Sequence, residues 1–136
     1  MNLKEINQLL AEAEDGLGGG LAATDVFSKQ SGMSIAGIRT APKACALFNL
    51  VTERATEAIK KSGLPIPDNL QSLIIQLGAD QENPLVLIAV IELDAKYRWG
   101  LAVDLTKASL GLLVSVVLPD TIPRLRAALG SSARAS

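Results

Sequence analysis

The chain has 136 residues, of which 49% are hydrophobic, so it can form one domain whose core needs no metal or disulfide. A net charge of −1 and an aromatic content of 3% argue against the basic surface and the stacking platforms of nucleic-acid-binding proteins. The chain has no histidine and only one cysteine, so it lacks the commonest general base and metal ligand and cannot form an internal disulfide.

The ends and the apolar runs of the sequence bear on where the protein resides. The polar N-terminus does not resemble a signal peptide. The longest apolar runs, residues 85–91 and 110–114, are much shorter than the roughly 20 residues that span a membrane. We therefore expect a cytoplasmic protein without membrane insertion and without a nucleic-acid partner.

The N-terminal segment is predicted to form a helix followed by a hairpin. Apolar residues recur at helical spacing from Leu3 to Ala13, Asn2 is a good N-cap, and Glu5 occupies the capping-box position. Glycines at 16 and 18–20 end this helix. The two predicted strands of the hairpin are residues 21–27 and 33–38, joined by a polar turn that ends in a glycine.

Residues 42–62 are predicted to form the longest helix, with Pro42 in its first turn and Gly63 just beyond its end. Its apolar side chains cover about half of the circumference, more than the roughly 100° stripe of a surface helix. Two explanations fit an apolar arc of this width. The helix is deeply buried under a sheet, or it packs against both a sheet and another chain. The residues expected to face the core are Leu47, Leu50, Val51 and Ala58.

The segment 70–77 is predicted to form a short helix, because its leucines and isoleucine follow helical spacing. A strand is the alternative. Three antiparallel strands are then predicted at 84–93, 97–105 and 110–118, because the first and last are apolar on both faces and the middle one alternates. A final helix begins near Asp120, and residues 131–136 are expected to form a flexible tail after a single domain, residues 1–130.

Residues with catalytic potential are few, and we predict no catalytic, cofactor or metal site. The glycines at 16–20 lack the Lys-Ser or Lys-Thr of a phosphate-binding loop and lead into a strand. Cys45 is interpreted as a semi-buried apolar residue. Asp15, Asp25 and Asp104 lie on separate predicted elements, and each is interpreted as a solvated charge.

The order of these elements resembles the roadblock family, the dynein light-chain roadblock-like fold. The segments that carry the resemblance are the Ile-x-x-Leu-Leu helix at 6–10, the glycine-led strand at 19–25, the glycine-led strand at 32–36 and the alanine-rich helix at 44–59. The resemblance implies an α/β fold of the α+β type, with a five-stranded, mainly antiparallel, roadblock/profilin-like sheet covered by helices on both faces. The segment 64–84 is longer than the link that the family usually has. If 70–77 is the third strand instead, 110–118 must join the last helix, against which Pro119 and Pro123 argue.

The resemblance also implies a function. Roadblock domains are dimers without catalytic residues of their own, and they serve as scaffolds and regulators of small GTPases; bacterial members often act beside a Ras-like GTPase. We therefore expect a homodimer that binds a small GTPase and is not an enzyme. The alternative is a small-molecule sensor domain of the PAS or GAF type.

The resemblance places the dimer interface on the long helix and the edge strand after it. We take residues 85–91 as that edge, because this run is apolar throughout and contains no lysine or proline that would block pairing with a second chain. Arg54 is expected at the rim of the interface. The predicted interface residues are Cys45, Phe48, Thr52, Arg54, Ala55, Ile59, Leu85, Val86, Leu87, Ile88 and Ala89.

Overall fold

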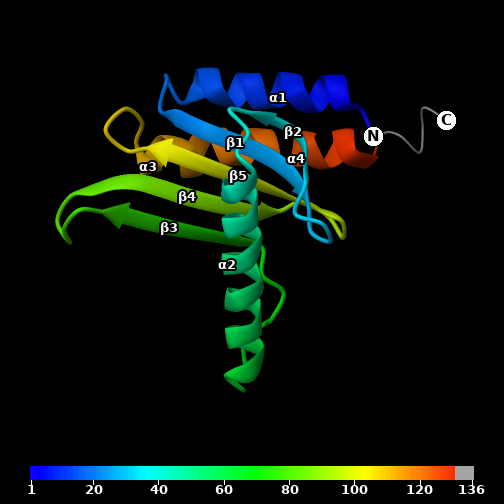
Figure 1. The fold of residues 1–136 in the computed structure, drawn as a ribbon, viewed down its shortest axis with the longest axis vertical. Coiled ribbons are helices and arrows are strands. Elements are labelled where there is room, and N and C mark those ends of the chain that lie inside the picture. Colours follow the sequence, from blue (N-terminus) through cyan, green and yellow to red (C-terminus); the bar gives the residue numbers. More distant parts are fainter. Residues whose placement is uncertain (131–136) are drawn as a thin grey trace.

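The computed structural model describes residues 1–130 as one five-stranded antiparallel sheet with helices on both faces (Figure 1). The strand order is β2-β1-β5-β4-β3, so β2 and β3 are the edges. The elements in chain order are α1 (Leu3–Gly16), β1 (Leu21–Ser28), β2 (Ser34–Ile38), α2 (Pro42–Lys61), β3 (Ser72–Gly78), β4 (Pro84–Glu92), β5 (Tyr97–Asp104), α3 (Leu110–Leu112), the π-helical turn η1 (Leu113–Val117) and α4 (Leu118–Gly130).

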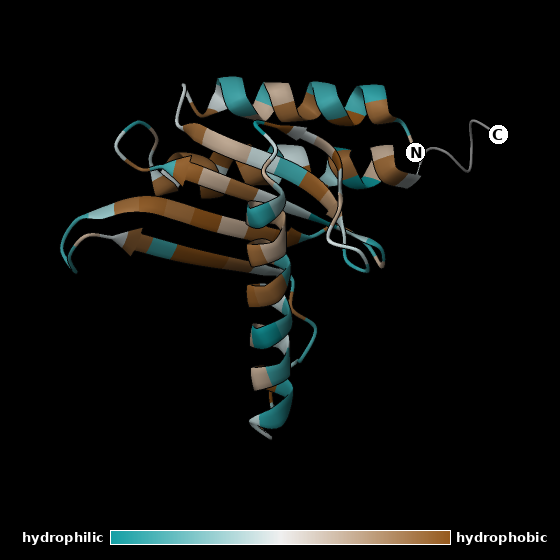
Figure 2. Cartoon of the chain, viewed as in Figure 1, coloured by the Kyte–Doolittle hydropathy of each residue, from teal (hydrophilic) through white to brown (hydrophobic). Residues whose placement is uncertain are grey.

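One face of the sheet carries the larger core, beneath α1 and α4. Asn2 caps α1 by accepting a hydrogen bond from the Glu5 N–H, and the apolar side of the helix, from Ile6 to Ala13, is buried. Trp99 is fully buried in this layer and donates from its indole N–H to the hydroxyl of Thr24 at 2.7 Å. Within residues 1–130, the opposite face carries only α2 and a smaller core. Figure 2 shows hydrophobic residues along β3 and β4 to the left of this helix.

Two segments form a different kind of secondary structure from the one predicted. Residues 72–78 form the edge strand β3 rather than a helix, with Leu73 and Ile75 half-buried and their neighbours exposed. Residues 110–118 form a helix rather than a strand: Ser109 caps it by accepting from the Leu112 N–H, and the chain stays helical to Gly130. The π-helical turn ends at Val117, two residues before Pro119, whose missing N–H removes an ordinary helical hydrogen bond at that position.

The predicted phase of α2 is also wrong. Leu47 and Leu50 are 44% and 54% exposed, whereas Phe48 is buried against the sheet. The fully buried residues of this helix are Cys45, Phe48 and Thr52. Because the apolar arc is so wide, its centre does not identify the side that packs on the sheet.

The strand predicted to be an edge is an interior strand. β4 pairs with β3 on one side and with β5 on the other, so its backbone has no free edge. Its continuous apolar run reflects burial under α2 on one face and under α1 and α4 on the other. The free edge on this side of the sheet belongs to β3. The predicted tail, residues 131–136, lies outside the described residues.

Candidate interaction surfaces around α2

Phe48 of α2 makes a close contact with the sheet. A Cβ atom on Gly100 of β5 would lie 2.3 Å from Cδ2 of Phe48, so only glycine lets the ring come this near to the strand. Phe48 also stacks on Phe27 of β1, with ring centroids 6.2 Å apart. The helix is therefore fixed at its N-terminal half, above β1 and β5.

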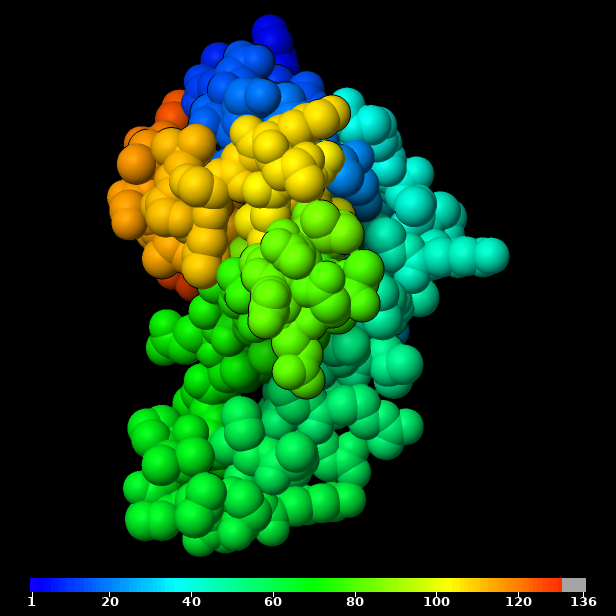
Figure 3. Space-filling view, turned by 90° about the vertical axis from the view of Figure 1, so that its left-hand side faces the viewer, coloured from blue at the N-terminus to red at the C-terminus, as the bar shows by residue number. Residues whose placement is uncertain are grey.

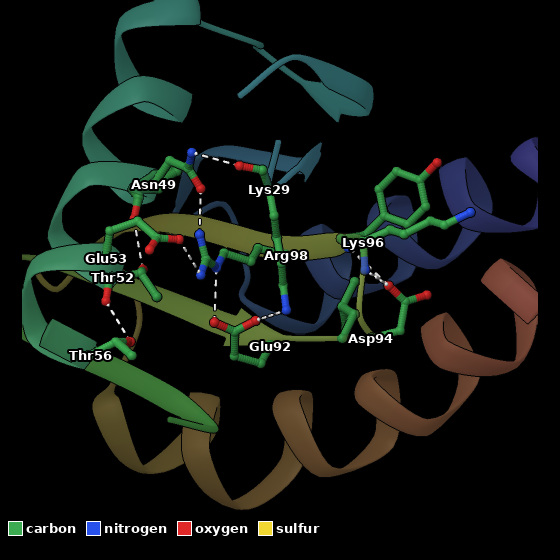
Figure 4. A network of polar contacts seen from close by, with 12 residues as sticks. Lys29, Asn49, Thr52, Glu53, Thr56, Glu92, Asp94, Lys96 and Arg98 are labelled. Carbon is green, nitrogen blue, oxygen red and sulfur yellow. Dashed lines mark hydrogen bonds and ion pairs between the residues drawn. The ribbon is translucent and has the colours of Figure 1, made fainter. Parts of the chain in front are cut away.

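A buried ion-pair network holds one flank of α2 (Figure 4). Arg98 of β5 is only 5% exposed and donates to Glu92 at 2.9 Å, to Glu53 at 2.8 Å and to Asn49 at 2.5 Å. Lys29 pairs with the second oxygen of Glu92 at 2.6 Å. Because Glu53 and Asn49 lie on α2, the network fixes the rotation of the helix over the sheet.

The other flank of α2 borders an uncovered part of the sheet. Gly100 of β5 lies beneath Phe48 of α2. Two residues before Gly100, Arg98 contacts Asn49 and Glu53 on one flank of the helix. Two residues after Gly100, Ala102 therefore lies toward the opposite flank. That opposite flank carries Leu47 and Val51, about a quarter turn or more from the buried row. Beside it the α2 face of β4 and β3 remains exposed. We call this set the open apolar surface: Leu47, Val51, Ile75, Leu77 and Val86.

The C-terminal half of α2 continues past the sheet edge. Figure 1 shows the helix crossing β1, β5 and β4 and extending beyond β3. Ala55 and Ile59 continue the row that faces the sheet, yet both are only half-buried, because none of the five described strands lies beneath them. In Figure 3 the turn between β3 and β4, in light green, stands between α2 on the right and the C-terminal helices on the left.

The structure separates the predicted interface residues into three groups. Cys45, Phe48 and Thr52 are buried in the chain's own core and are not surface residues. In β4, Leu87 and Ala89 are buried against α1 and α4, and Ile88 is 9% exposed beneath α2. The residues that remain accessible are Arg54, Ala55, Ile59, Leu85 and Val86.

Two exposed apolar residues of the open apolar surface were not predicted for the interface: Leu47 of α2 and Leu77 of β3. The sequence did contain a signal for Leu47. An apolar arc of half a circumference must expose some of its members when only one sheet covers it.

Asp25 is buried rather than solvated. It is 0% exposed, and its Oδ1 accepts hydrogen bonds from the hydroxyls of Ser34 and Thr40, both at 2.7 Å. The pKa of the Cys45 thiol is raised to about 12, chiefly by burial and secondly by the nearby Asp25 carboxylate. Cys45 is therefore a neutral thiol and not an activated nucleophile.

The described residues show no metal centre and no membrane span. Within residues 1–130 no group of three or more cysteine, aspartate or glutamate side chains is placed to hold an ion. In the same part of the chain, no helix has the length and apolarity needed to cross a bilayer.

Comparison with solved structures identifies the fold. Myxococcus xanthus MglB superposes with a TM-score of 0.73 at 13% identity, covering 95% of this chain and 90% of that one. The gliding protein MglB from Thermus thermophilus gives 0.68 at 20% identity, covering 93% and 89%. A Roadblock/LC7 domain from Streptomyces avermitilis gives 0.61 at 9% identity, covering 89% and 92%. The sequence matches no protein-family model and no curated protein. The expected roadblock-like fold is confirmed.

Proposed function

We propose that this chain is a non-catalytic, homodimeric scaffold or regulatory domain that binds a small Ras-like GTPase. The observation that carries the proposal is the overhang of α2, whose sheet-facing row continues beyond the edge of its own sheet. A fold alone does not specify function, so the proposal depends on this surface as well as on the roadblock architecture. The solved structures named above are Mgl and roadblock proteins, which favours a scaffold over a sensor of the PAS or GAF type.

A second copy of the chain fits the overhang. If β3 pairs with β3 of a two-fold-related copy, the two sheets become continuous and the partner's sheet lies beneath the C-terminal half of α2. Ala55 and Ile59 then gain the burial that they lack in one chain. The open apolar surface lies beside the same edge, where the partner's α2 would pack. This arrangement moves the proposed edge from β4, as the sequence suggested, to β3.

The dimer can be tested by light scattering after size-exclusion chromatography. The wild-type protein should elute as two chains of 14.2 kDa each. Ile59→Glu should weaken the dimer by about 2 kcal/mol or more, roughly thirtyfold in Kd, because it places a charge in a desolvated contact. Met33→Glu is the matched control, since Met33 is 69% exposed and lies away from this edge. A wild-type monomer at micromolar concentration would contradict the proposal.

The GTPase is proposed from the roadblock resemblance and is tested separately. Tagged protein should retain, from native lysate, a protein that carries bound guanine nucleotide. The purified chain alone should not hydrolyse GTP or phosphoesters, since it has no histidine and a neutral cysteine. Hydrolysis that persists through purification and disappears in Asp25→Asn would refute the non-catalytic assignment.

A further inference from the structure

A cavity of about 630 Å³ opens on the flank of α2 that faces away from the open apolar surface. It lies between the first half of α2 and the turn between β1 and β2, and is lined by Ser34, Thr40, Cys45, Asn49, Leu50 and Glu53, among others. Its volume falls within the range of small-ligand sites, roughly 300–1,000 Å³. Because it does not involve the β3 edge, its occupancy is independent of the proposed dimer.

The floor of this cavity is a set of hydrogen-bond acceptors. Ser34 and Thr40 line the cavity, and both hydroxyls donate to the buried Asp25 carboxylate behind them; the Ser34 hydroxyl also lies 3.2 Å from the carbonyl oxygen of Ala36, a second acceptor. Each hydroxyl has one hydrogen, so its oxygen can only accept from a ligand. These groups pack closely against Gly37: a Cβ at this position would lie 2.1 Å from Asp25 Oδ1 and 2.3 Å from the Thr40 hydroxyl.

The negative charge beneath this floor has no cationic partner within residues 1–130. Arg98 and Lys29 are engaged by Glu92 and Glu53, and Arg39 by Glu14; none pairs with Asp25. The second oxygen of Asp25 is buried and accepts no hydrogen bond from a nitrogen or hydroxyl among the described residues, and the neutral Cys45 thiol beside the carboxylate supplies no counter-charge. A buried carboxylate without a counter-charge is unfavourable, so a cation in the adjacent cavity would be stabilised.

The residues at the walls and the opening of the cavity indicate the chemistry of the remainder of the ligand. Met33 and Leu50 are 69% and 54% exposed and flank the cavity, while Pro42 and Ala46 form an apolar wall. Glu53, half-exposed, adds a carboxylate at the lining, with one oxygen on Arg98. The combination suits an aliphatic stem that ends in a donor group.

We propose that this cavity binds an aliphatic cation, an ammonium or guanidinium group on a short alkyl chain, whose head lies against Ser34 and Thr40 above Asp25. The cation belongs either to a free small amine or to a lysine or arginine side chain of a partner protein. Its positive charge offsets the buried carboxylate, and its stem lies along the wall formed by Pro42 and Ala46, where it covers the exposed side chains of Met33 and Leu50.

The test is a titration followed by amide chemical shifts of the full chain. Butylguanidinium and butylammonium should give saturable shifts at residues 31–34 and 40–53, and neutral butylurea should not. Ala46→Leu, which fills the cavity from an exposed helical position, should weaken binding by at least about tenfold. Ala58→Leu, exposed on the same helix outside the cavity, is the matched control and should leave binding unchanged. Asp25→Asn should abolish the preference for the cation over butylurea.

The two sources are distinguished by a short peptide with one central arginine. Binding of the peptide at least about tenfold tighter than butylguanidinium supports a partner side chain, and equal or weaker binding supports a free small cation. If Asp25→Asn does not fold, Ala46→Leu decides alone. The proposal is overturned if neither cation gives saturable shifts, if butylurea binds equally well, or if Ala46→Leu binds as the wild type does. A monomeric wild type would refute the dimer without affecting this result.

Discussion

Replacing Gly100 by alanine tests whether the close contact beneath α2 fixes that helix. The new Cβ would lie 2.3 Å from Cδ2 and 2.7 Å from Cε2 of Phe48, so either the ring or the helix must move. The ring is stacked on Phe27, and the helix is tied to Arg98 through Asn49, which leaves little room for a compensating shift. We expect the free energy of unfolding to fall by about 1–3 kcal/mol, the usual cost of overpacking. This outweighs the roughly 0.5–1 kcal/mol that alanine gains over glycine in a regular strand.

Urea denaturation followed by circular dichroism measures this loss. Gly111→Ala is the control, because nothing lies within 4 Å of a Cβ there; it should be neutral or stabilising by up to about 1 kcal/mol. A double-mutant cycle with Phe48→Ala should give a coupling energy of about 1 kcal/mol or more, since removing the ring removes the clash. If Gly100→Ala and Gly111→Ala have the same unfolding midpoint, the contact does not restrain α2.

Two further predictions concern buried groups near the same helix. Arg98→Met should cost about 1–3 kcal/mol in urea denaturation because Glu92 Oε1 and Asn49 Oδ1 lose their donor while Lys29 still pairs with the other oxygen of Glu92. Glu53→Gln, at a half-exposed position, should cost about 0–1 kcal/mol. For Cys45, the folded pKa of about 12 exceeds the ordinary thiol value of 9.0, so stability relative to Cys45→Ala should be constant below pH 9.0 and fall as pH rises toward 12. A flat difference would contradict the burial of the thiol.

Local signals in the sequence were sufficient for α1, the hairpin and the ends of α2. The Asn2 cap, the glycines after α1 and Pro42 act within a few residues of the backbone that they shape, so no knowledge of the rest of the fold is needed. The middle strand at 97–104 was equally readable, because one of its faces carries large apolar side chains and the other small or polar ones.

Contacts with distant parts of the chain determine the secondary structure of the segments that sequence analysis assigned wrongly. Residues 72–78 have a pattern compatible with either element, and pairing with β4 selects the strand. Residues 110–118 are rich in β-branched side chains, but Leu113 and Val117 are four residues apart and are both buried as one side of a helix. Neither of the prolines that argued against a helix ends it: Pro119 follows the π-helical turn, and Pro123 lies inside α4.

The burial of Asp25 could not have been predicted, because its stabilising partners come from elsewhere in the fold. Ser34 lies on β2 and Thr40 in the segment before α2, and Gly37 permits their approach. The same limitation applied to the phase of α2, which depends on Gly100, far along the chain.

The two flanks of α2 differ because one is held by charges and the other is not. On the Asn49 side, Arg98 fixes the helix, and the neighbouring cavity lies over a buried carboxylate. On the Leu47 side, the helix meets the sheet among the described residues through apolar side chains, and the uncovered surface is apolar. A cavity with an apolar wall and a floor of hydrogen-bond acceptors selects a small amphipathic cation, and an apolar flank beside a free strand edge selects a large complementary surface. One helix therefore offers two binding surfaces of different chemistry, so a partner's cation and a second copy of the chain need not compete.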